Sequence, residues 1–163
     1  MRTAYERFSR LDEILVRVRE LSARTVIFDV EPLVAYWDSG QAALDRGVEL
    51  VLSRVRELPQ VELVCFATNS LRRPLILPAD AGVRVVYVAS AGKPLRTGFY
   101  QGFPRPGVVI GDQVATDGIL ARRLGYTFAQ YRPRPDGVPA GPRLMNGFGQ
   151  LVRPLLFTRP GRG

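Results

Sequence analysis

The sequence predicts a three-layer α/β domain built around a parallel sheet, and three observations point to this fold class. Strand-like apolar runs alternate with segments of helical periodicity, the pattern of a parallel sheet joined by right-handed crossovers. Most of these runs are apolar without interruption, as expected for strands that are covered on both faces. The 163 residues suffice for one domain with one hydrophobic core, so we expect a single domain over residues 1–163.

The expected elements follow one another in a regular order. Apolar residues from Leu11 to Leu21 recur at helical spacing, and this stripe predicts a helix over about residues 4–22. Strands are expected at residues 24–30, 61–67, 83–89, 107–110 and 126–131. Helices are expected at residues 42–58, 94–101 and 113–124.

The C-terminal part has a different composition. From Arg132 onward proline and glycine become frequent, so we expect an extension over about residues 136–163. Within it, a helix interrupted by Pro154 is expected at residues 144–157, and disorder is expected at residues 158–163.

Composition excludes several kinds of chemistry. The chain has no histidine and a single cysteine, Cys65, which lies in an apolar run and is expected to be buried. These counts exclude Ser-His-Asp and Cys-His catalysis, histidine or structural zinc sites, and a disulfide framework. Carboxylates, lysine, hydroxyls and backbone groups remain, which favours oxygen-ligated metals and phosphoryl or carbonyl chemistry. Cysteine usage and the lack of long apolar runs lead us to expect a cytoplasmic protein.

The formal net charge is +8, and arginine supplies most of it. Such a surface attracts anions, among them phosphates, nucleic acid and acidic lipid headgroups. A generally basic protein without an anionic partner is the alternative. Binding to nucleic acid is the weakest of these interpretations, because aromatic residues do not interleave closely with the arginines of the C-terminal part.

Carboxylates gather at the ends of two predicted strands. Asp29 ends the first strand and Glu31 follows it, while Asp112 and Asp117 follow the fourth strand. In open α/β sheets this carboxyl edge is where ligands bind. Two like charges about 4 Å apart repel by about 4 kcal/mol at an effective dielectric of 20. We therefore expect a cation among these acids, and oxygen ligands favour a hard one such as Mg²⁺.

Four short motifs stand in order along the chain. They are the acid pair Asp29 and Glu31, the hydroxyl of Thr68 within residues 67–70, the pair Lys93-Pro94, and the Gly-Asp-x4-Asp pattern of residues 111–117. This order resembles the haloacid dehalogenase superfamily of phosphatases. The last motif, Gly-Asp-Gln-x-x-Thr-Asp, is similar to that of the YqeG-like branch of subfamily IIIA, and the resemblance covers about residues 24–135.

The resemblance implies a fold and a metal site. The fold would be Rossmann-like, with a five-stranded parallel sheet in the order 3-2-1-4-5 and a minimal cap or none. Asp29 would be the nucleophile that forms an aspartyl-phosphate, and it would also coordinate Mg²⁺. The backbone carbonyl of Glu31 would be a further ligand, and Asp112 with Asp117 would complete the metal shell.

The resemblance also implies a phosphate site. Thr68 would hydrogen-bond a phosphoryl oxygen, Asn69 beside it would contribute to substrate binding, and Lys93 would neutralise the nucleophile and the transferring phosphate. These roles agree with physical chemistry, because a loose phosphoryl-transfer transition state needs positive charge around its oxygens and an in-line nucleophile. The expected activity is Mg²⁺-dependent hydrolysis of a phosphomonoester through Asp29.

The first motif departs from the family pattern, which usually reads Asp-x-Asp-x-Thr. Glu31 takes the place of the second aspartate, which protonates the leaving group and activates water, and Leu33 takes the place of the threonine. Glu31 reaches further by one methylene, about 1.5 Å, and a misplacement of about 1 Å can cost about 10²-fold in rate. The alternative function is a catalytically degenerate protein that binds a phosphate-bearing partner as a scaffold or regulatory subunit.

The segments between the motifs are too short for a separate cap domain, so the site is expected to be open. An open site suits a bulky phosphorylated substrate such as a lipid headgroup, a nucleotide or a protein. The basic surface would also suit peripheral contact with an anionic membrane. Near the motifs, Arg72 and Arg73 could hold a substrate anion or form a solvated face, and Tyr36 and Trp37 could line the mouth of the site or serve only in packing.

Overall fold

A parallel sheet lies at the centre of the structure, a computed structural model that describes residues 3–78, 82–132 and 157–158. Neighbouring strands pair in parallel, in the order β4-β3-β2-β5-β6-β1-β7. The strands are β1 (Thr3–Phe8), β2 (Thr25–Asp29), β3 (Leu63–Ala67), β4 (Arg84–Val88), β5 (Gly107–Gly111), β6 (Thr127–Tyr131) and β7 (Phe157–Thr158). The predicted α/β class with a parallel sheet is confirmed.

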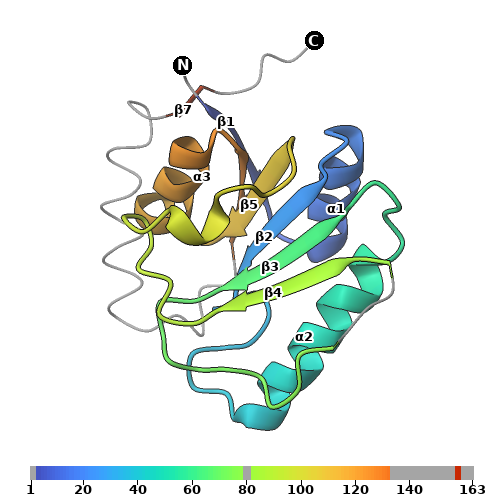
Figure 1. Cartoon of the computed structure of the whole chain (residues 1–163), viewed down its shortest axis with the longest axis vertical. Coiled ribbons are helices and arrows are strands. Elements are labelled where there is room, and N and C mark those ends of the chain that lie inside the picture. Colours follow the sequence, from blue (N-terminus) through green and yellow to red (C-terminus); the bar gives the residue numbers. More distant parts are fainter. Residues whose placement is uncertain (1–2, 79–81, 133–156, 159–163) are drawn as a thin grey trace.

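Helices cover both faces of this sheet, as Figure 1 shows. They are α1 (Leu11–Glu20), α2 (Gln41–Val55), the 3₁₀ turn η1 (Gly98–Tyr100), the π-helical turn η2 (Val114–Gly118) and α3 (Ile119–Leu124). Helices α1 and α2 pack on one face, where the rings of Phe28 and Phe66 stack 5.8 Å apart. The opposite face packs against η2 and α3 around Phe128.

The five strands predicted from the sequence keep their relative order, β4-β3-β2-β5-β6, within this sheet. A five-stranded sheet was nevertheless the wrong prediction, because β1 and β7 extend the sheet beyond β6. Strand β1 lies where the sequence predicted the start of a helix over residues 4–22, and its Tyr5 pairs with Phe128. The apolar stripe that predicted this helix begins only at Leu11, and the residues before it form a ladder of hydrogen bonds with β6.

Most other predicted elements differ from the observed ones at their ends. The helix expected at residues 113–124 is divided between η2 and α3, and the helix expected at residues 94–101 is reduced to η1. The helix expected at residues 42–58 ends at Val55. The described residues that follow β3, up to Pro78, form no helix.

The C-terminal predictions fall largely outside the described residues. The helix expected at residues 144–157 lies outside them except for its last residue, Phe157, which begins β7 and is therefore not helical. Thr158 was expected to be disordered, but it pairs with Ala4 of β1.

The turn after β5 brings an acidic residue back against the end of that strand. A Cβ atom at Gly111 would overlap the carboxylate of Asp117, so only glycine permits this close approach. The carbonyl oxygen of Gln113 accepts hydrogen bonds from the backbone nitrogens of Asp117, at 2.9 Å, and Gly118, at 3.2 Å. Such single π-helical turns are frequent at functional sites.

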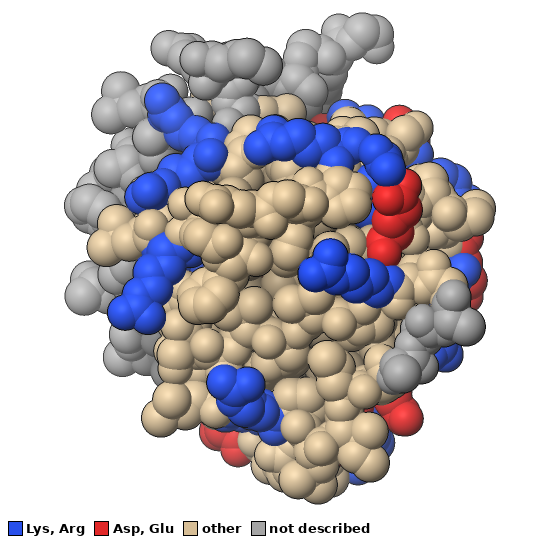
Figure 2. Space-filling model, viewed as in Figure 1, with Lys and Arg blue, Asp and Glu red and all other residues tan. Residues whose placement is uncertain are grey.

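The surface is dominated by uncharged and basic residues on the face that Figure 2 shows, where acidic side chains are few. Among the described residues, no helix combines the length and the apolar character needed to cross a bilayer.

Candidate active site

Lys93 lies between two buried carboxylates at the carboxyl edge of the sheet. Its Nζ is 2.8 Å from Oδ1 of Asp29 and 2.7 Å from Oδ1 of Asp117. It also donates a hydrogen bond of 3.3 Å to the carbonyl oxygen of Ala67. These contacts use all three donors of the ammonium group, and the side chain is 2% exposed. The structure thus brings together the lysine and the first-motif aspartate that the sequence singled out.

Lys93 is also the single lysine of the chain, since the other 22 of its 23 basic residues are arginine. A compact ammonium fits between two carboxylates, whereas a planar guanidinium on a longer side chain needs more room. A lone lysine in an arginine-rich chain therefore indicates a position that requires a compact cationic group. That Lys93 is the single lysine could be seen in the sequence, and it supports the choice of Lys93 as a site residue.

Burial and charge act in opposite directions on these groups. Burial alone would lower the pKa of Lys93, but the charges of Asp117 and Asp29 outweigh it, so this pKa is raised and the lysine stays charged. Burial raises the pKa of Asp29, the charge of Asp117 raises it further, and Lys93 only partly opposes them. A second cation beside Asp29 would favour its ionised form.

Asp29, Asp112 and Asp117 form a buried acidic cluster. Each offers one oxygen, and these three atoms lie within 4.8 Å of one another. When all three are ionised, the single positive charge of Lys93 leaves the cluster with an excess of negative charge that a divalent cation would balance. Carboxylate oxygens fit a hard cation such as Mg²⁺ or Ca²⁺, and the donor set alone does not select between the two.

Asp112 is held by a chain of hydrogen bonds that begins on β1. Gln130 on β6 is 1% exposed, and its Nε2 donates a 2.7 Å hydrogen bond to the carbonyl oxygen of Asp112. Its Oε1 accepts a 2.6 Å hydrogen bond from the hydroxyl of Tyr5, which also contacts Arg7. Sequence reasoning missed these residues because the segment of Tyr5 was expected to be helical. The available signal was a lone amide in the predicted strand 126–131.

The carboxylate of Glu31 contacts the segment after β3. Its Oε2 accepts a 2.7 Å hydrogen bond from the hydroxyl of Thr68, and its Oε1 lies 3.4 Å from the hydroxyl of Ser70 and from the guanidinium of Arg72. Glu31 is buried but is not one of the three acids that cluster around a possible cation position. Its backbone carbonyl therefore remains the only group of Glu31 for the metal contact that the resemblance implies.

Asn69 holds the backbone of Lys93 at two points. Its Oδ1 accepts a 2.8 Å hydrogen bond from the backbone nitrogen of Lys93, and its Nδ2 donates a 3.1 Å hydrogen bond to the carbonyl oxygen of that residue. Asn69 was expected to bind substrate, and its hydrogen bonds give it the additional role of positioning Lys93.

A pocket of about 200 Å³ opens beside these groups. Its volume is about seven times the roughly 30 Å³ that one water molecule occupies in the liquid, which leaves room for a phosphate group. The residues that line it are Asp29, Glu31, Trp37, Thr68, Asn69, Ser70, Arg72, Lys93, Gln113 and Thr116. The pocket is thus lined by residues from all four motifs, with Gln113 and Thr116 supplied by the fourth.

Arg72 closes one side of this pocket. Its guanidinium donates 2.8 Å hydrogen bonds to the carbonyl oxygens of Tyr36 and Ser39, in addition to its contact with Glu31. Arg72 therefore joins the loop after β2 to the loop after β3, and the interpretation of this residue as a solvated face is wrong.

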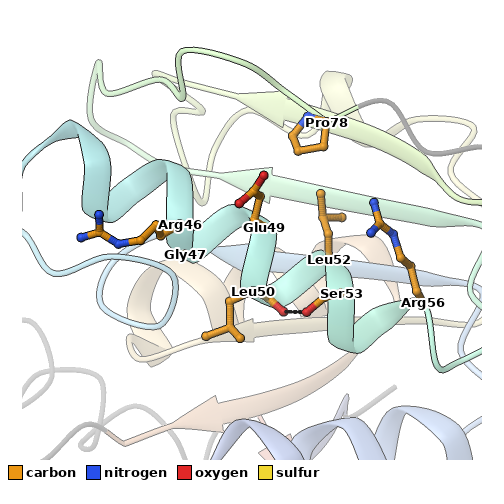
Figure 3. A pocket seen from close by; sticks show the side chains of 8 residues that line it. All are labelled: Arg46, Gly47, Glu49, Leu50, Leu52, Ser53, Arg56 and Pro78. Atoms are coloured by element: carbon orange, nitrogen blue, oxygen red, sulfur yellow. Dashed lines mark hydrogen bonds between the residues drawn. The ribbon is translucent and has the colours of Figure 1, made fainter.

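A larger pocket, about 680 Å³, lies along α2 and is shown in Figure 3. It is lined by Arg46, Gly47, Glu49, Leu50, Leu52, Ser53 and Arg56 of the helix and by Pro78. Glu49 is the single acid among these lining residues, and the hydroxyl of Ser53 is bonded to the carbonyl oxygen of Leu50 at 2.8 Å. The smaller pocket is therefore the candidate active site, because it has the acids, the lysine and the hydroxyls.

No protein-family model matches this chain, and comparisons with curated proteins and with solved structures found no significant match. A function must therefore be inferred from the residues and geometry of the site itself.

Proposed function

We propose that this protein is a Mg²⁺-dependent phosphatase that hydrolyses phosphomonoesters through an aspartyl-phosphate on Asp29. The observation that carries the proposal is the position of Lys93 between Asp29 and Asp117, with Asp112 in the same buried cluster. A nucleophilic carboxylate, a fixed cation and acids able to hold a divalent metal are the parts that this chemistry requires. The relative order of the five strands predicted from the sequence also agrees with the resemblance to the haloacid dehalogenase superfamily.

The acidic cluster would hold the metal. Asp29, Asp112 and Asp117 would each contribute one carboxylate oxygen, and the backbone carbonyl of Glu31 would add a further ligand. When bound, Mg²⁺ would supply positive charge to the phosphoryl oxygens. Lys93, whose Nζ lies 2.8 Å from Oδ1 of Asp29, would supply a second positive charge.

Two displacements complete the reaction. In the first, the carboxylate of Asp29 attacks phosphorus, the bond between phosphorus and the leaving oxygen breaks, and Glu31 acts as the general acid that gives a proton to that oxygen. In the second, Glu31 takes a proton from a water molecule whose oxygen attacks phosphorus. This step breaks the bond to Asp29 and releases inorganic phosphate. Each bond that forms is matched by one that breaks, and Glu31 ends with its original proton count.

A catalytically degenerate binder of phosphate-bearing partners is the second candidate, and one observation favours it. The hydroxyl of Thr68, which the resemblance assigns to a phosphoryl oxygen, donates to Glu31 at 2.7 Å. Ser70 and Arg72 lie near the same carboxylate. An entering phosphate must therefore compete with Glu31 for these donors, which slows or prevents turnover.

A screen for phosphate release tests both candidates. Lipid, nucleotide, sugar and peptide phosphates are each assayed with Mg²⁺ and with a chelator, using the wild type, Asp29→Asn, and the exposed control Asp38→Asn. We expect metal-dependent release by the wild type and by Asp38→Asn, and none by a folded Asp29→Asn protein. Undiminished release by Asp29→Asn would reject the covalent mechanism. Phosphate binding without release, followed by the fluorescence of Trp37 at the pocket, would favour the degenerate binder.

A further inference from the structure

Four large aliphatic residues stand within seven positions of one another in the segment after β3. Leu71, Leu75 and Ile76 are 84%, 79% and 78% exposed, and Leu77 is also exposed. Single exposed apolar residues are normal on protein surfaces, but contiguous groups of them mark interaction sites. We call residues 71–77 the apolar loop.

The apolar loop is fixed to the protein by its backbone. The backbone nitrogen of Leu75 donates a 2.9 Å hydrogen bond to the carboxylate of Asp45, and the carbonyl oxygen of Arg73 accepts a 2.9 Å hydrogen bond from the side chain of Gln41. Both partners belong to the first turns of α2, beside which Figure 1 shows this segment passing. The backbone polar groups at these positions are thus bonded within the protein, while the aliphatic side chains remain in solvent.

The apolar loop adjoins the candidate active site. Arg72, within the loop, lines the smaller pocket and is anchored further by a 3.0 Å hydrogen bond from the hydroxyl of Tyr87 to its carbonyl oxygen. At its other end the loop leads into Pro78, which together with Leu50 lines the larger pocket in Figure 3. A binding partner that covered the apolar loop would therefore lie next to the active-site pocket.

Positive charge accompanies this apolar surface. Arg73 is exposed within the loop, and Arg46 and Arg56 are exposed around the larger pocket, where Glu49 is the acid among the lining residues. The chain as a whole carries a net charge of +8. Aliphatic side chains flanked by arginine are typical of segments that lie in a membrane interface, where anionic headgroups attract the cations.

We propose that the apolar loop docks this protein on an anionic lipid bilayer. Leu71, Leu75 and Ile76 enter the boundary between headgroups and acyl chains, and Arg73 lies among the headgroups. A second copy of this chain fits this surface less well, because it carries the same net charge of +8 and would repel the arginines beside the loop. The proposal concerns a surface outside the acidic cluster and does not rest on phosphatase activity.

Co-sedimentation of the full chain with vesicles tests this proposal. The vesicles are phosphatidylcholine alone and phosphatidylcholine mixed with phosphatidylserine. We expect binding to the mixed vesicles that weakens as salt is raised. The double variant Leu75→Ser with Ile76→Ser is expected to bind about 10²-fold more weakly, since each buried aliphatic side chain is worth about tenfold in affinity. The matched control Val16→Ser, on α1 and 55% exposed, is expected to bind as the wild type does.

Thermal unfolding checks that each variant is folded. We expect all of them to be folded, because the three substituted residues are exposed and their replacement should leave the core intact. Wild-type protein that stays in the supernatant with mixed vesicles overturns the proposal. Equal sedimentation of the wild type and the double variant also overturns it. If the substitutions instead abolish a concentration-dependent self-association in analytical ultracentrifugation, and vesicles bind neither protein, the loop is an interface between copies and the bilayer proposal is wrong.

Discussion

Gln130 donates a 2.7 Å hydrogen bond from Nε2 to the backbone carbonyl oxygen of Asp112, so a buried amide on β6 fixes one member of the acidic cluster. The same amide accepts a 2.6 Å hydrogen bond from Tyr5 on β1. Two hydrogen bonds therefore connect an added strand of the sheet to a candidate metal ligand. Such supporting contacts commonly orient the groups that bind a metal directly.

We predict that Gln130→Leu weakens Mg²⁺ binding. The substitution leaves the Asp112 carbonyl and the Tyr5 hydroxyl without this partner, and loss of a supporting contact typically costs about 10- to 100-fold in metal affinity. The variant should also lose about 1–3 kcal/mol of stability, because two buried polar groups each lose a hydrogen bond. Calorimetric titration with Mg²⁺ and thermal unfolding in chelator measure the two effects separately.

Gln101→Leu provides the control, since Gln101 is exposed and follows η1. This variant should bind Mg²⁺ as the wild type does. A Gln130→Leu protein with unchanged Mg²⁺ affinity would show that Asp112 is positioned without the amide.

Two acids of the cluster, Asp29 and Asp112, could be predicted from sequence because each stands at the end of a buried apolar run. Asp29 ends β2 and Asp112 follows β5, and adjacent parallel strands necessarily bring their carboxyl ends together. The support for Asp112 could not be predicted in this way. Tyr5 and Gln130 are 125 positions apart, and a short strand that mixes apolar and charged residues has no helical or strand periodicity strong enough to recognise.

The contacts of Glu31 were likewise beyond prediction. Its first-motif position was recognised from spacing, but its partners Thr68, Ser70 and Arg72 depend on how two irregular loops pack against each other. Periodicity fixes no side-chain direction in such loops. By contrast, burial of Cys65 was predicted from its uninterrupted apolar run and is confirmed.

We predict that Lys93→Met destabilises the protein by about 3–5 kcal/mol in the absence of divalent metal. Methionine has nearly the same length but no charge, so Asp29 and Asp117 would lose the cation that lies 2.8 and 2.7 Å from them. Millimolar Mg²⁺ should restore part of the loss by neutralising the same carboxylates. Urea unfolding with Mg²⁺ and with chelator measures both quantities.

The variant Lys93→Arg keeps the charge and serves as the comparison. We expect it to be destabilised as well, because the guanidinium is larger than the space that the ammonium occupies at 2% exposure. Stability close to that of the wild type in both variants would contradict the view that a compact cation holds the cluster together.

We predict that the thiol of Cys65 resists alkylation in the folded protein at pH 8. Burial raises its pKa to about 12, and the side chain is fully buried on β3. The thiolate forms readily only when the protein opens, so the labelling rate reports unfolding. Since Cys65 is the single cysteine, mass spectrometry of the intact chain counts the modification directly.

The same labelling provides a test of metal binding that does not depend on activity. At a Mg²⁺ concentration 100 times its dissociation constant, labelling through global opening should slow by about 10²-fold. Urea-unfolded protein is the control and should react at once. A labelling rate that is unaffected by Mg²⁺, in protein that opens globally, would speak against a metal site in the acidic cluster.

The last prediction concerns the rate that Glu31 permits. Glu31→Asp, alone and with Leu33→Thr, is expected to raise kcat by up to about 10²-fold on the best substrate of the screen. The shorter side chain should lose its 2.7 Å contact with the Thr68 hydroxyl and free this donor for a phosphoryl oxygen. A gain in kcat without a proportional change in KM would locate the effect in the chemical step.

If the wild type is inactive and the double variant gains activity, the natural protein is a degenerate binder. If both variants are slower than an active wild type, Glu31 is the working acid and base of a site built around it, and the prediction of impairment is wrong.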